Sequence, residues 1–271
     1  MSYENDEFEF TPTIYTPTDQ ELPYLREALG ELYAEQWFTD ILYKVKGGKE
    51  ATVYCLAAHP STGLKHIAAK VYRPRMFRAM KNDSFYRIGR TTTGPDGKME
   101  FRGRAMRALK KRTQFGREIE MASWNGHELR LLQELHAAGA QVPKPLAAGP
   151  NCILMEFLGD ETQGAPTLHS LHPDRGQAKD FFEQLMRDVE LMLSKFLVHG
   201  DLSPHNVLVH QDRPWIIDLP QAVQADTHPG AYMLLNRDVE RLCHYFQKHG
   251  VECDAGKITA SLWSRFMRGP M

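Results

Sequence analysis

Apolar positions recur along this chain with two periods, and these predict its helices and strands. Apolar residues at every third or fourth position predict helices over 21–38, 115–138, 177–197, 230–249 and 256–268. Short apolar runs bounded by Gly, Pro, Asn or Asp clusters predict strands over 41–46, 51–58, 67–72, 145–158, 207–209 and 215–217. A strand-rich first half followed by a helical second half predicts an α+β fold with two lobes.

Two segments lack either period. Residues 1–18 are acidic and contain Thr and Pro, which predicts a loosely ordered start of the chain. Residues 73–114 form a long polar segment. We therefore expect an N-terminal extension with one helix over residues 1–40, and a single two-lobed domain over 41–271.

Composition sets mild bounds on this picture. The 271 residues are 42% hydrophobic, which is enough for a substantial core, and the net charge of −1 indicates no general attraction to nucleic acid or membrane. The four cysteines are widely spaced and favour reduced thiols over disulfides or zinc. The chain shows neither a signal-peptide pattern nor a run of about 18 apolar residues. We expect a soluble, cytoplasmic protein with no membrane partner.

The strongest chemical pattern is His199-Gly-Asp201, with Asn206 five residues after the aspartate and Asp218 after a short hairpin. This is the layout of a phosphotransferase catalytic loop, in which Asp201 would accept or orient the proton of an attacking hydroxyl. Asn206 and Asp218 would hold Mg²⁺ against nucleotide phosphates, because Mg²⁺ prefers oxygen ligands. The turn over 211–214 would bring them to the same hairpin end. The alternative is a polar loop between buried strands.

A second pattern is the hairpin that contains Gly47, Gly48, Lys49 and Glu50, which leads into Val53. Glycines between two strands let the backbone approach phosphate oxygens closely. The hairpin lacks the full G-x-G-x-x-G spacing of protein kinases. The alternative interpretation is a plain β-turn with no role in phosphate binding.

Lys70 lies within an apolar strand, where an ammonium group is costly unless it is paired. A carboxylate of the following helix and the α- and β-phosphates of a nucleotide would pair it. Glu128 is the favoured carboxylate and Glu120 the second candidate. The alternative is a lysine at a strand end that reaches solvent.

Together these strings resemble the RIO family of atypical serine/threonine protein kinases. The resemblance runs in the family's order from about residue 43 to 245. It is carried by residues 48–54, 69–73, 153–159, 165–168, 197–206, 216–223, 228–232 and 237–239. It implies a small bilobal kinase fold that depends on ATP and Mg²⁺, with an N-lobe over about 41–155, a hinge over 156–159 and a reduced C-lobe over 160–271.

The resemblance also implies roles for individual residues. Lys70 would contact the α- and β-phosphates, and Asp201 would be the catalytic base, with Asn206 and Asp218 as metal ligands. The phosphate loop and adenine contacts would come from Gly47, Gly48, Lys49, Glu50, Val53, Met155 and the backbone of Glu156 and Leu158.

The chain departs from conventional protein kinases in several ways that RIO proteins share. Gly200 stands where such kinases have an Arg beside the catalytic Asp, and Asp218-Leu-Pro replaces Asp-Phe-Gly. Regulation by activation-loop phosphorylation is therefore not expected. The N-terminal region is also too short for a winged-helix domain.

Eight basic residues lie between Lys98 and Arg117, against one acid, Glu100. Family analogy implies a flexible insertion that can carry autophosphorylation sites, for which Ser84 and Thr91–Thr93 are available. The basic residues are also suited to RNA, ribosomal or acidic partners, or else form a solvated helix face.

Three functions remain open from the sequence. The first is a RIO-type kinase that phosphorylates Ser or Thr of a protein, itself included. The second is a small-molecule phosphotransferase of the aminoglycoside-kinase kind, which shares the catalytic hairpin. The third is an ATPase-driven assembly switch, in which Asp218 would itself accept the phosphoryl group.

Overall fold

The structure is a computed structural model that describes residues 10–48, 51–72 and 114–269, with side chains from residue 126 onward in the last range. The contacts divide the chain into two compact units. Of the described residues, the first unit holds 10–48, 51–72, 114–129 and 145–157, and the second holds 130–144 and 158–269. In the described part of the chain, no helix is both long and apolar enough to span a membrane.

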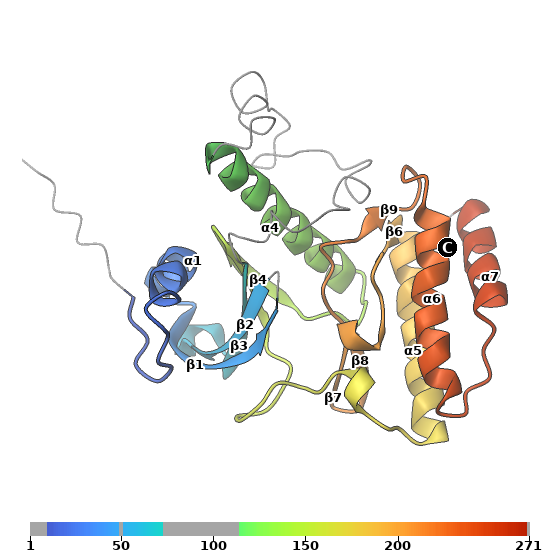
Figure 1. The fold of residues 1–271 in the computed structure, drawn as a ribbon, viewed down its shortest axis with the longest axis horizontal. Coiled ribbons are helices and arrows are strands. Elements are labelled where there is room, and N and C mark those ends of the chain that lie inside the picture. Colours follow the sequence, from blue (N-terminus) through green and yellow to red (C-terminus); the bar gives the residue numbers. More distant parts are fainter. Residues whose placement is uncertain (1–9, 49–50, 73–113, 270–271) are drawn as a thin grey trace, which may run out of the picture. The chain divides into compact units, whose positions relative to one another are not determined.

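The first unit is built on an antiparallel sheet with the strand order β1-β2-β3-β5-β4 (Figure 1). Each central strand is rich in β-branched and apolar residues that fit a pleated, buried surface. The strands are β1 (Phe38–Gly47), β2 (Ala51–Ala58), β3 (His66–Tyr72), β4 (Pro145–Gly149) and β5 (Cys152–Glu156).

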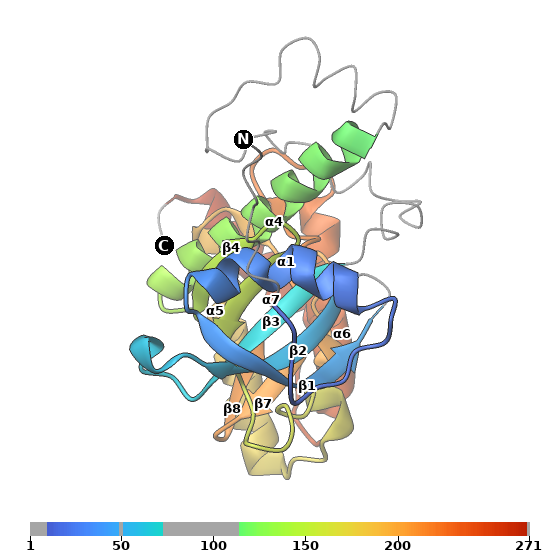
Figure 2. The same ribbon diagram turned by 90° about the vertical axis from the view of Figure 1, so that its left-hand side faces the viewer.

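Helix α1 (Leu22–Ala34) covers one face of this sheet (Figure 2). Its buried stripe packs against alternate residues of the strands, as side-chain alternation requires. The resulting core contains Leu25, Ala28, Leu29 and Leu32 of the helix with Tyr54, Leu56, Ile67, Ala69, Val71, Cys152 and Leu154 of the sheet.

Residues 10–15 also belong to this unit. Phe10 is buried in the same core, and the amide of Tyr15 donates to the carbonyl of Ile41 at 3.1 Å. The prediction of a loosely ordered start was therefore wrong for these residues, because an aromatic side chain and a backbone hydrogen bond attach them to the sheet.

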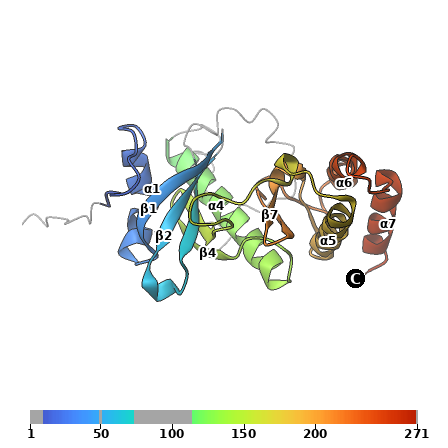
Figure 3. The ribbon, with the colours of Figure 1, turned by 90° about the horizontal axis from the view of Figure 1, so that it is seen from below.

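The second unit contains three long helices, α5 (Arg175–Ser194), α6 (Ala231–Gln247) and α7 (Ala255–Met267), which pack side by side (Figure 3). Asp174 caps the start of α5 by accepting from the amide of Gln177, and Asp254 caps α7 in the same way through Lys257. The chain passes from the first unit to the second within helix α4 (Gln114–Ala137), after Leu129.

Two small antiparallel pairs position the loops of the second unit. Strands β7 (Val207–His210) and β8 (Arg213–Ile216) form the predicted hairpin, and β6 (Leu197–Val198) pairs with β9 (Val223–Gln224). Gln211 and Asp212 both have positive φ, +50° and +54°, as the tightest hairpin turns require.

Most element boundaries agree with the sequence predictions within a few residues. The predicted strand over 145–158 is instead a hairpin of β4 and β5, which turns at residues 150–151. Helix α1 ends at Ala34, and the predicted 21–38 overran into β1 because Trp37 and Phe38 are apolar. The predicted domain start at residue 41 falls inside β1. The predicted hinge over 156–159 contains the point between Phe157 and Leu158 where the chain passes from the first unit to the second.

Candidate active site

The loop that carries Asp201 is held by a buried carboxylate from α6. Both oxygens of Asp238 accept backbone hydrogen bonds, from the amide of Gly200 at 2.8 Å and from the amide of Leu202 at 3.1 Å. Gly200 has φ +77°, a conformation that favours glycine. Asp201 is thus fixed by hydrogen bonds to the residue on each side of it.

Burial raises the pKa of Asp238 to about 7, although the two amides and the neighbouring guanidiniums of Arg237 and Arg241 favour the charged form. Arg237 donates from Nη2 to the carbonyl of Gly200. Helix α6 therefore holds both the N–H and the C=O of Gly200.

His199 links the same loop to the segment before Asp218. Its Nδ1 accepts from the amide of Asp201 at 3.3 Å, so the ring proton lies on Nε2, which donates to the carbonyl of Ile217 at 3.1 Å. The imidazole is 2% exposed, so this hydrogen-bonded position is shielded from water.

Asn206 and Asp218 are brought together as the sequence predicted. The amide of Ile217 donates to the carbonyl of Asn206 at 3.0 Å, directly after the β7–β8 hairpin. Asn206 Nδ2 donates to the carbonyl of Asp201 at 2.9 Å and lies 3.4 Å from its Oδ2. Because Nδ2 is directed at Asp201, Oδ1 is the side-chain atom of Asn206 that could hold a cation. Asp218 has φ +70°, which aspartate tolerates better than most residues.

Arg241 of α6 forms an ion pair with Asp201, with 2.8 Å between Nη1 and Oδ1. Both side chains are partly exposed, at 39% and 37%. The sequence shows no Arg beside Asp201, yet the fold supplies one from a position 40 residues further along the chain.

In the first unit, three of the residues expected to contact the nucleotide share the sheet face opposite α1. Val53 of β2 pairs with Lys70 of β3, which in turn pairs with Ile153 of β5. Met155 pairs with Ala68, two residues before Lys70 on the same strand. Because side chains alternate between faces, Val53, Lys70 and Met155 lie on one face.

Lys70 is paired as predicted. Its Nζ lies 2.8 Å from Glu128 Oε1, and Tyr72 donates its hydroxyl to Glu128 Oε2. The Lys70 side chain is 12% exposed and that of Glu128 is 3% exposed. Glu128, the favoured candidate, is therefore a partner of Lys70, and a neighbouring phenol orients its carboxylate, whereas the side chain of Glu120 lies outside the described residues.

The hairpin between β1 and β2 brings backbone very close to Gly48. A Cβ atom there would lie 2.9 Å from the carbonyl oxygen of Ala51, to which the Gly48 amide donates. Gly47 is the last residue of β1. Lys49 and Glu50 lie outside the described residues.

Glu156 ends β5 in the first unit, and Leu158 begins the following segment in the second. The Leu158 carbonyl accepts from the amide of Ala165 at 2.8 Å. The basic segment 98–117 and the hydroxyls of Ser84 and Thr91–Thr93 lie outside the residues whose side chains the structure describes.

Asp238 and Arg241 were not predicted from the sequence to have a role at this site. Asp238 had a signal, because it lies on the apolar stripe of α6 between Leu234 and Leu242, where a lone carboxylate needs partners. Arg241 had none, since an arginine on an amphipathic helix is ordinary.

Comparison with known proteins places these motifs in a family. Residues 65–258 match the model of the RIO domain. The chain is 36% identical over 135 residues to the RIO-type serine/threonine-protein kinase Rio1 of Thermoplasma acidophilum. The matched stretch covers 50% of this chain and 69% of that protein.

Two eukaryotic relatives match over longer stretches of this chain. The serine/threonine-protein kinase RIO1 of Caenorhabditis elegans is 31% identical over 208 residues, or 76% of this chain, and the human RIO1 is 26% identical over 231 residues, or 84%. In each case the match spans 37% of the relative's length. With the RIO domain model matching most of its length, this chain belongs to the RIO family of kinases.

Proposed function

We propose that this chain is an ATP- and Mg²⁺-dependent serine/threonine protein kinase that transfers the γ-phosphoryl group of ATP to a protein hydroxyl, its own included. The position of Asp201 carries the proposal. Its loop is held by Asp238, and its carboxylate is approached by Asn206 and Arg241. A carboxylate fixed in this way is suited to orient a hydroxyl and accept its proton.

Asn206 and Asp218 fit the role of Mg²⁺ ligands. Asn206 Nδ2 is directed at Asp201, so the amide presents Oδ1 to a cation, and Asp218 adds a carboxylate next to Ile217, which is bonded to Asn206. Two protein oxygens suffice, because Mg²⁺ keeps several waters and phosphate ligands. Mg²⁺ held there would neutralise negative charge on the transferred phosphoryl group.

The first unit would contribute the nucleotide contacts. Lys70, oriented by Glu128, would contact the α- and β-phosphates, and Gly48 would let backbone approach them. From the second unit, Leu158 would meet the base through its N–H, since its carbonyl is bonded to Ala165. The remaining contacts we propose are Gly47, Lys49, Glu50, Val53, Met155 and the backbone of Glu156.

The substrate we propose is a protein, as the names of the relatives indicate for those proteins. All four cysteines are free thiols, in keeping with a cytoplasmic location. An RNA or ribosomal partner for segment 98–117 stays a prediction from the sequence.

The test incubates the protein with γ-labelled ATP and Mg²⁺ and follows label into protein, small molecules and free phosphate. Asp201→Asn should lower transfer by at least about 100-fold, the usual worth of a general base. The control Asp212→Asn makes the same change in the exposed turn of the β7–β8 hairpin, where Asn accepts positive φ, and should leave transfer unchanged.

The chemistry of the labelled protein separates the two main functions. Phosphoserine and phosphothreonine survive acid, whereas an acyl phosphate is lost to hydroxylamine. If hydroxylamine removes the label and the label maps to Asp218, the kinase proposal is wrong and an ATP-driven switch is the function. Label found only in an added small molecule would favour a small-molecule phosphotransferase.

A further inference from the structure

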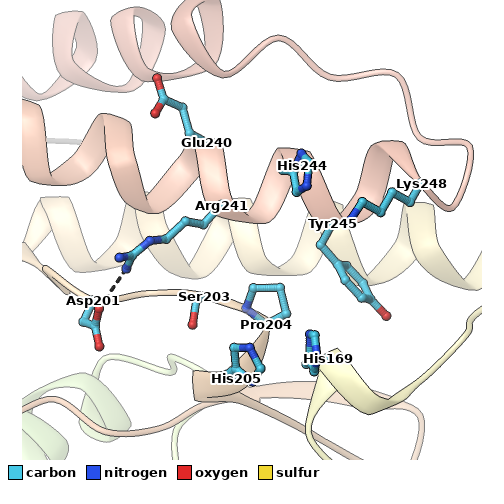
Figure 4. A pocket seen from close by; sticks show the side chains of 10 residues that line it. All are labelled: His169, Asp201, Ser203, Pro204, His205, Glu240, Arg241, His244, Tyr245 and Lys248. Atoms are coloured by element: carbon cyan, nitrogen blue, oxygen red, sulfur yellow. Dashed lines mark hydrogen bonds and ion pairs between the residues drawn. The ribbon is translucent and has the colours of Figure 1, made fainter.

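A hollow of about 510 Å³ begins at Asp201 and follows one face of α6 (Figure 4). Its other wall is formed by the short helix η3 (Leu168–Ser170) and by residues 203–205 of the catalytic loop. This volume is within the range of ligand sites in proteins. Neither Asn206 nor Asp218 lines the hollow, so it is distinct from the proposed metal ligands.

Five basic side chains line this hollow, which we call the basic groove. They come from three separate segments, and His169, His205, His244 and Lys248 are exposed. Each imidazole offers at least one N–H donor, and Lys and Arg carry permanent charge. The members of the basic groove are His169, His205, Arg241, His244 and Lys248.

The two carboxylates of the hollow leave its far end basic. Asp201 is paired with Arg241 at 2.8 Å. Glu240 accepts from Asn236 at 2.5 Å, and it points away from Asp201 in Figure 4. The part of the basic groove beyond Arg241 therefore presents donors and positive charge without a nearby acid among its lining residues.

We propose that the basic groove binds an acidic segment of the protein substrate and so selects which Ser or Thr reaches Asp201. Lys248 directly follows α6 and is seven residues after Arg241, a distance of about 10 Å along the helix axis. An extended peptide rises about 3.3 Å per residue. An acidic side chain about three positions from the phosphorylated hydroxyl would therefore reach Lys248.

A peptide fits this site better than RNA does. Among the described residues that line it, Tyr245 is the only aromatic ring besides the histidines; it is 8% exposed and donates its hydroxyl to the carbonyl of Leu171 at 3.0 Å. It is thus not available as a platform on which bases stack. The hollow also begins at Asp201, where the acceptor hydroxyl of a protein substrate is expected.

The experiment measures binding and phosphoryl transfer separately, because the proposal rests on the proposed kinase function. Four fluorescent peptides each carry one Ser and differ only at the residues three positions before and three positions after it. One peptide has Glu at the position before the Ser and one has Glu at the position after it. The third has Gln at both positions, and the fourth has Lys at both. Binding to the full chain is followed by anisotropy at low and high salt. We expect one Glu peptide to bind about 3- to 10-fold tighter than the Gln peptide, with the difference shrinking in salt.

A charge reversal makes the test specific to the groove. Lys248→Glu should abolish the preference for Glu and instead favour the Lys peptide, a gain that a misfolded protein would not show. The control Lys257→Glu makes the same change on α7, where the side chain is 87% exposed and lines a different hollow. It should keep the parent preference.

The outcomes separate the groove from the kinase function. Acidic-peptide binding that responds to Lys248→Glu, with no transfer to any peptide, would leave the basic groove assigned and overturn the kinase proposal. Transfer that ignores peptide charge, or equal binding of all four peptides, would overturn the groove. A single-stranded RNA that binds tighter than the Glu peptides and is released by Lys248→Glu would also overturn the assignment to a peptide.

Discussion

The ion pair between Lys70 and Glu128 should couple the two residues far more strongly than a surface pair of the same length. Its N–O distance is 2.8 Å, with side chains 12% and 3% exposed. Lys44 and Glu21 are also 2.8 Å apart, but 34% and 22% exposed. The two pairs differ mainly in burial, and both lie in the first unit.

The expected magnitudes follow from this difference. Breaking one partner of a buried pair costs about 3–5 kcal/mol because an unpaired charge stays behind. We expect a coupling free energy of about 2–3 kcal/mol for Lys70→Met with Glu128→Gln, against about 0.2–1 kcal/mol for Lys44→Met with Glu21→Gln. Gln at 128 keeps an oxygen that can accept from Tyr72, so the cycle isolates the charge.

Native-state hydrogen exchange is the suitable assay, because a chain with two compact units need not unfold in one transition. The opening free energy of amides in β2 and β3 is measured for the parent, both single variants and the double variant of each pair. Equal coupling energies in the two cycles would refute the argument that burial strengthens the Lys70 pair. So would a larger value for the exposed pair.

Three further predictions concern other parts of the fold. Asp238→Asn leaves a single acceptor oxygen for the amides of Gly200 and Leu202, so we expect the opening free energy of α6 amides in native-state hydrogen exchange to fall by about 1–3 kcal/mol and phosphoryl transfer to be reduced; unchanged values would contradict its positioning role. Asp188 lies on α5, and burial raises its pKa to about 6. Between about pH 4 and pH 6 the folded protein therefore keeps a proton on Asp188 that the unfolded chain has released. The resulting stability, at most about 3 kcal/mol, is complete below about pH 4 and is lost as pH rises through 6; Asp188→Asn should flatten this part of the pH profile. Exposed Gln36 has φ +62° just after α1, so Gln36→Gly should stabilise the fold by up to about 1 kcal/mol, and any loss of stability would count against strain at that residue.

The sequence by itself determined the features that depend on local pattern. Apolar periodicity located the helices and most strands, because the period of burial follows from the geometry of each element. The spacing of Asn206 and Asp218 across a turn fixed their proximity, since a hairpin brings its ends together whatever surrounds it. Their roles, like that of Asp201, stay proposals.

Only the tertiary structure decided the contacts between distant segments. It paired Lys70 with Glu128, and it attached Phe10 to the sheet core. It also brought Asp238 and Arg241 of α6 to the loop of Asp201. A side chain carries no local signal of a partner 36 to 58 residues away, because that contact depends on how whole elements pack rather than on the pattern within one of them.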